Sequence, residues 1–110
     1  MKQYVIDELR PDDFAALEKY LDAKFEAGGM TGLYMKPIDP DLLTEHQASH
    51  PQCAPHYFSW ILENNQLICE LLVRTKARMQ GDCMGYATEA QRNWIIRKAD
   101  AIFDELGLIA

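Results

Sequence analysis

A short turn between two apolar segments is the feature of this sequence that most restricts its fold. Residues 56–63 and 66–74 alternate in side-chain character, and Asn64-Asn65 lies between them. Asparagine tolerates the positive φ angles of a two-residue hairpin turn, and such a turn sets the register of the strands that it joins. The sequence therefore predicts an antiparallel β-hairpin in which Trp60 faces Cys69.

This register gives the hairpin two faces, and both carry apolar side chains. One face consists of four predicted cross-strand pairs: Leu62 with Leu67, Trp60 with Cys69, Phe58 with Leu71, and His56 with Val73. The other face carries Tyr57, Ile61, Ile68 and Leu72, mixed with Ser59 and Glu70. Because large apolar patches rarely stay exposed, we expect a helix or another protein chain to cover part of this second face as well.

Helical patterns flank the hairpin on both sides. Pro11 and the acids after it predict a helix that ends at Gly28-Gly29. Asp39 predicts the start of a second helix, which runs to about His50 and stops before a proline. The longest helix is predicted at 88–106, where a capping-box pattern precedes the apolar stripe.

Three further segments are predicted to be strands: residues 4–6, residues 33–35, and about 82–87, which would pair back across Gln80-Gly81. We therefore predict one α+β domain over residues 1–110. Its antiparallel sheet has a central meander at about 56–87 and is packed by two or three helices.

The charge distribution restricts the partners that the protein can bind. Residues 1–63 hold 11 acids and 5 bases, a net charge of −6, whereas residues 64–110 hold 6 of each and are neutral. This acidity argues against nonspecific binding to nucleic acids or anionic membranes. No apolar run approaches the roughly 18 residues of a membrane-spanning helix.

The cysteine content and the first residues bear on the cellular compartment. Residues 1–4 lack a signal-peptide pattern, so we expect the protein to be cytoplasmic. The chain has 3 cysteines, an odd number. In a reducing compartment this favours free or metal-bound thiols over a disulfide framework.

One group of side chains has the composition of a zinc site. His46, His50, Cys53 and His56 fall within eleven residues, and the first two are one helical turn apart. Four nitrogen and sulfur donors are what a structural zinc site needs, so zinc is the one cofactor that we consider. The alternative is that both histidines flank the apolar face of their helix and that Cys53 lies in a loop. Cys53 paired with His50 or His56 as a nucleophile is a further, less supported alternative.

A second group suggests a site for a small anion. Three alternating cations would project from one face of a strand, beside the start of the last helix, whose first N–H groups are free. Together they would bind a phosphate or carboxylate; the residues are Arg74, Lys76, Arg78, Thr88 and Arg92. The alternative is a solvated strand edge, on which cations discourage aggregation.

The order of elements resembles the front half of GNAT-type acetyltransferases, with a strand–helix start, a meander and a long helix that ends in residues 105–108. That family binds acetyl-CoA pyrophosphate on a glycine-containing loop. The matching residues 91–96 read Gln-Arg-Asn-Trp-Ile-Ile, with large side chains at both glycine positions. The resemblance therefore implies element order and not acetyl transfer.

No catalytic motif is present in the sequence, and we assign no catalytic residue. Our leading hypothesis is a small cytoplasmic interaction domain without enzymatic activity. It would bind a protein partner or a second copy through an interface comprising Tyr57, Ile61, Ile68 and Leu72. The alternatives are a binding domain for a small anionic ligand and a zinc-stabilised domain.

Overall fold

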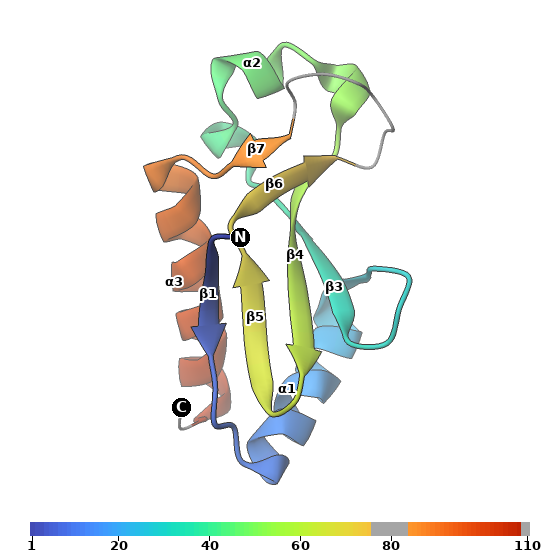
Figure 1. The fold of residues 1–110 in the computed structure, drawn as a ribbon, viewed down its shortest axis with the longest axis vertical. Coiled ribbons are helices and arrows are strands. Elements are labelled where there is room, and N and C mark those ends of the chain that lie inside the picture. The colour runs from blue at the N-terminus through green and yellow to red at the C-terminus, as the bar shows by residue number, and fades with distance from the viewer. Residues whose placement is uncertain (76–83, 109–110) are drawn as a thin grey trace.

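The structure, a computed structural model, describes residues 1–75 and 84–108 (Figure 1). The β-strands are β1 (Gln3–Ile6), β2 (Glu26–Ala27), β3 (Leu33–Pro37), β4 (His56–Glu63), β5 (Gln66–Glu70), β6 (Leu72–Thr75) and β7 (Gly85–Tyr86). The α-helices are α1 (Pro11–Lys24), α2 (Glu45–Ala48) and α3 (Glu89–Leu106), and two short 3₁₀ helices are η1 (Pro40–Leu42) and η2 (Pro51–Cys53). The fold is α+β with the longest helix C-terminal, which confirms the predicted class.

All strand pairs of the sheet are antiparallel. The main path of the sheet runs β1-β5-β4-β3-β2, and β6 pairs with both β4 and β7. The long strand β4 therefore has β5 along one half and β6 along the other. No helix in the described part of the chain is long and apolar enough to cross a membrane.

The hairpin turn forms as predicted. Asn64 and Asn65 both have positive φ, 52° and 59°, and Trp60 pairs with Cys69. Beyond this point the predicted register is wrong by two residues, because His56 pairs with Thr75 rather than with Val73.

The cause of this shift is an interruption at Leu71, which also removes the predicted pairing of this residue with Phe58. The Leu71 N–H donates to the Lys2 carbonyl at 3.1 Å, and its carbonyl accepts from Ala87 at 2.8 Å, so neither group extends the ladder to β4. A shift of two residues preserves the alternation of side chains. Val73 accordingly still faces the core and is fully buried.

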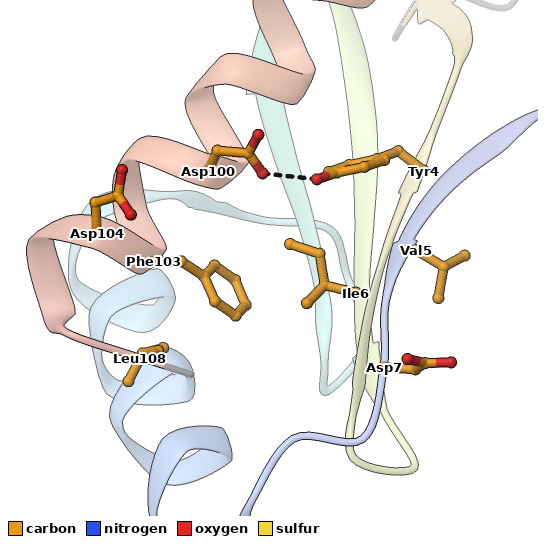
Figure 2. Close-up of a pocket in the computed structure, with 8 residues that line it drawn as sticks. All are labelled: Tyr4, Val5, Ile6, Asp7, Asp100, Phe103, Asp104 and Leu108. Carbon is orange, nitrogen blue, oxygen red and sulfur yellow. Dashed lines mark hydrogen bonds between the residues drawn. The ribbon is translucent and has the colours of Figure 1, made fainter. Parts of the chain in front are cut away.

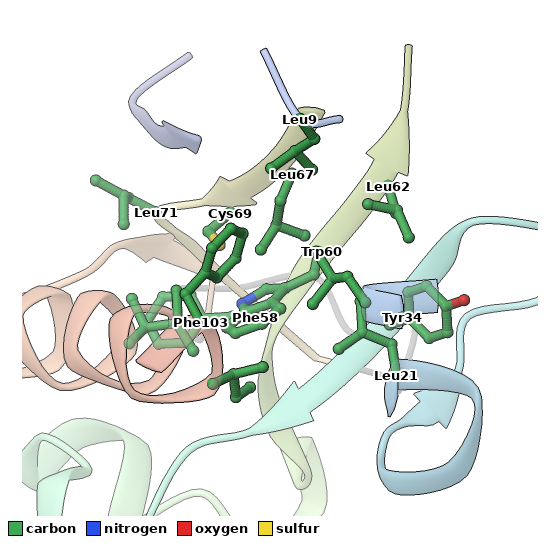
Figure 3. Close-up of a cluster of buried hydrophobic side chains, with 14 of the residues drawn as sticks. Leu9, Leu21, Tyr34, Phe58, Trp60, Leu62, Leu67, Cys69, Leu71 and Phe103 are labelled. Carbon is green, nitrogen blue, oxygen red and sulfur yellow. The ribbon is translucent and has the colours of Figure 1, made fainter. Parts of the chain in front are cut away.

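The hydrophobic core lies between the sheet and the two long helices, α1 and α3, which both lie behind the sheet in Figure 1. The sheet side chains are those of the face predicted to be apolar, and Figure 3 shows several of them against α3 and α1. The buried side chains from the three elements are Phe58, Trp60, Leu62, Leu67, Cys69 and Val73 of the sheet, Leu17 and Leu21 of α1, and Ile95, Ala99, Ile102 and Phe103 of α3. Each large one contributes about 1.5–3 kcal/mol through burial.

Two predicted helices have different bounds in the structure. The first ends at Lys24 rather than at Gly28, because residues 26 and 27 pair with β3 as strand β2. The predicted helix over 39–50 is replaced by two shorter elements, η1 and α2. Thr44 has an extended backbone and forms a capping box with Gln47, so the helix restarts there.

The third strand of the meander is also shifted from the predicted register. β7 pairs Tyr86 with Leu72 and Gly85 with Val73. The predicted turn at Gln80-Gly81 would instead bring Ala87 opposite Arg74. The predicted turn at residues 80–81 and the first two residues of the predicted strand at 82–87 lie outside the described residues.

Candidate interaction surface

Four apolar side chains form a row across four neighbouring strands on the face opposite the helices. Val5 pairs with Ile68, Ile68 with Ile61, and Ile61 with Leu33, on β1, β5, β4 and β3. Directly paired residues of an antiparallel sheet project to the same side, so the row is continuous. We call this side of the sheet, which also carries Tyr57 and Leu72, the open face.

The open face is separate from the core. Ile68 is 9% exposed and Val5 is 38% exposed, and neither belongs to the core cluster. Tyr57, Ile61 and Leu72, which lie on this side of the sheet, are partly exposed. The four predicted interface residues therefore share the open face. Figure 1 shows the face turned towards the viewer, with α1 and α3 on the far side.

Val5 and Leu33 belong to the open face but were not part of the predicted interface. They lie on strands far from the hairpin in sequence, and their pairing with it depends on the tertiary fold. The local signal for Val5 is the short apolar run of residues 4–6, which predicts a strand.

A shallow hollow of about 300 Å³ lies on the open face beside the apolar row. Arg74 and Glu70 line it and form an ion pair, with 3.0 Å between Nε and Oε1. The Arg74 side chain is 32% exposed and that of Glu70 is 13% exposed. The two charges compensate each other, so this part of the open face is close to neutral.

Three of the five residues of the predicted anion site lie in the described part of the chain, and each of them has a partner of its own. Arg74 pairs with Glu70, and the Thr88 hydroxyl accepts a hydrogen bond from the Gln91 N–H as the N-cap of α3. Arg92 is exposed, with Nη2 3.4 Å from the Asn93 side-chain oxygen. Lys76 and Arg78 lie outside the described residues. The register that would have placed Arg74 beside the start of α3 is not the observed one.

The predicted zinc ligands are only partly brought together. The rings of His46 and His50 stack with centroids 4.2 Å apart, and Nδ1 of His50 donates to the His46 carbonyl at 2.6 Å. His56 is 4% exposed, and burial, followed by the charges of His46 and His50, lowers its pKa. The described residues contain no group of three or more potential ligands placed to hold a metal ion.

The cysteine chemistry differs from the prediction. Cys53 is disulfide-bonded, so the prediction of free or metal-bound thiols is wrong for this residue. Its sulfur is therefore not available as a zinc ligand or as a thiolate nucleophile. Cys69 is free and buried, and burial raises the pKa of its thiol. Cys83 lies outside the described residues.

Comparisons with known proteins find no family model, no curated protein and no solved structure that matches this chain. The functional argument therefore depends on the geometry of the chain itself. In the described part of the chain, the predicted interface residues Tyr57, Ile61, Ile68 and Leu72 lie on one side of the sheet.

Proposed function

We propose that this protein is an interaction domain without enzymatic activity that binds a second copy of itself through the open face. The observation that carries the proposal is the row of Val5, Ile68, Ile61 and Leu33 across four strands. Burying apolar surface stabilises an association by roughly 25 cal/mol per Å² before the entropic costs of binding. A flat sheet face can pack on another at a spacing of about 10 Å.

The charge of the open face supports a second copy as the occupant. A twofold interface places the same surface on both subunits, so that surface has to be compatible with itself. The chain carries a net charge of −6, but the charged pair beside the apolar row is internally balanced. Two copies can therefore bring this part of the open face together without adding an uncompensated charge from the Arg74–Glu70 pair.

Sedimentation velocity over a range of protein concentrations tests the proposal. The wild-type chain is expected to form a dimer, and Ile61→Glu is expected to be monomeric, because burying an unpaired carboxylate in the interface is costly. Ala15→Glu is the matched control, since Ala15 is exposed on α1. Circular dichroism of both variants checks that the fold is retained.

Two results would contradict the proposal. One is a wild-type chain that stays monomeric at high concentration. The other is a dimer that Ile61→Glu and Ala15→Glu affect equally.

A further inference from the structure

Strand β1 lies at the edge of the sheet and, among the described residues, pairs with β5 alone. The Leu71 N–H donates to the Lys2 carbonyl, so the backbone of Lys2 is turned towards β5. In an antiparallel pair, backbone groups turn towards the neighbour at every second residue, so those of Tyr4 do the same. The N–H and C=O groups of Gln3 and Val5 therefore point away from the sheet.

A hollow of about 540 Å³ lies between this edge and α3 (Figure 2). Its apolar lining includes Ile6, Phe103 and Leu108. Figure 2 shows Tyr4 and Ile6 pointing towards α3, whereas Val5 points away from it. A strand added beside β1 would thus place alternate side chains over this hollow.

Every charged side chain that lines the hollow in the described part of the chain is acidic. Asp100 and Asp104 project from α3, and Asp7 follows β1. Asp100 accepts a hydrogen bond from the Tyr4 hydroxyl at 2.6 Å, while Asp104 is exposed. The charge of the site is therefore suited to a cationic side chain.

We propose that the outer edge of β1 and this hollow bind an extended segment of a partner protein with lysine or arginine at alternating positions. Main-chain hydrogen bonds to Gln3 and Val5 would supply affinity, and the carboxylates of α3 would select the cations. A second copy of this chain is a poor occupant, because pairing two β1 edges would bring the same carboxylates of both copies together. The site adjoins the open face, because the Val5 side chain belongs to that face and the Val5 backbone belongs to the edge.

The binding test uses an eight-residue peptide of alternating lysine and threonine, with a glutamate–threonine peptide as its control. Amide hydrogen exchange followed by NMR is expected to slow at Gln3 and Val5 when the lysine peptide is added. Exchange at Tyr4 and Ile6 should change little, since the pattern of β1 turns their N–H groups towards β5. The glutamate peptide should protect none of these amides.

Four variants locate the site. Asp104→Asn should weaken lysine-peptide binding about threefold, the scale of one exposed charge pair, while Asp12→Asn on α1 should leave it unchanged. Val5→Pro should abolish binding, because proline has no N–H to donate to the peptide. The fold should be retained, since an edge strand tolerates proline where the missing N–H points away from the sheet. Ile61→Glu, which changes the open face, should bind the peptide as the wild type does.

Three outcomes would overturn the proposal. The first is equal binding of the glutamate peptide, and the second is the same loss for Asp12→Asn as for Asp104→Asn. The third is no slowing of exchange at Gln3 and Val5.

Discussion

At the scale of single residues, the contact between Tyr4 and Asp100 joins the edge strand to the longest helix. The Tyr4 hydroxyl donates to Asp100 across 96 positions of sequence. This hydrogen bond is the main reason that the Tyr4 pKa is raised from 10.0 to about 12, with burial as the second cause. The protonated phenol is therefore favoured in the folded state.

This shift predicts a stability term that depends on pH. A group whose pKa is raised on folding contributes stability fully below its unfolded pKa, and loses it as the pH rises through the folded value. The contribution of Tyr4 should thus be present below pH 10 and disappear as the pH approaches about 12. An NMR titration of the Tyr4 ring is expected to give a midpoint near 12, and Asp100→Asn should move it towards 10.0. An unchanged midpoint in Asp100→Asn would contradict the assignment.

At the scale of elements, the start of β3 depends on one glycine. Gly32 has φ of +81°, and a Cβ atom there would lie 2.6 Å from the Leu62 carbonyl oxygen. The Leu62 N–H donates to the Gly32 carbonyl at 2.8 Å, so the two backbones are held close together. Gly29 also has a positive φ, +96°, but has open space around it.

These two glycines form a matched pair for mutation. Gly29→Ala is expected to cost about 1–2 kcal/mol, from the left-handed backbone alone. Gly32→Ala carries the same backbone cost plus a steric overlap, and should be less stable by about a further 1–3 kcal/mol. Urea unfolding of the two variants measures the difference, and equal losses would show that the contact with Leu62 relaxes freely.

The elements that could be predicted are those whose signals are local. The turn at Asn64-Asn65, the capping box that starts α3 at Thr88 and the strand at 4–6 are all set by nearby residues. The failures at Leu71 and Thr44 have two separate causes. At Leu71 the backbone bonds to Lys2 and Ala87, which are distant in sequence, and at Thr44 a local cap competes with an otherwise continuous helical pattern.

The residues of the candidate site also divide into those with a local sequence signal and those without one. The hairpin half of the open face, Ile61 and Ile68, could be predicted because the turn sets its register. The other half, Val5 and Leu33, depends on how separate strands assemble. The hollow beside β1 depends on the packing of α3 against an edge, for which the sequence has no local pattern.

At the scale of the whole molecule, the disulfide of Cys53 adds a covalent link to a fold of 42 × 26 × 24 Å. A reductant is expected to lower the free energy of unfolding by about 2–4 kcal/mol, because it releases a constraint on the unfolded chain. Cys53→Ser should show the same loss without reductant and no further loss with it. If reductant leaves the free energy of unfolding of the wild-type chain unchanged, the Cys53 disulfide is contradicted.

Because disulfides persist mainly in oxidising compartments, cell fractionation is the direct test of the expected cytoplasmic location.

The packing of α2 against α3 has a consequence for the order in which the chain folds. The buried side chain of Gln91 donates to the Leu42 carbonyl at 2.9 Å and to the Gln47 side-chain oxygen at 2.8 Å, while its own oxygen accepts from the Thr88 N–H. A four-residue helix such as α2 is too short to persist alone in water. Its stability therefore depends on contacts with the start of α3, and we expect residues 45–48 to become helical only after that part of α3 has formed.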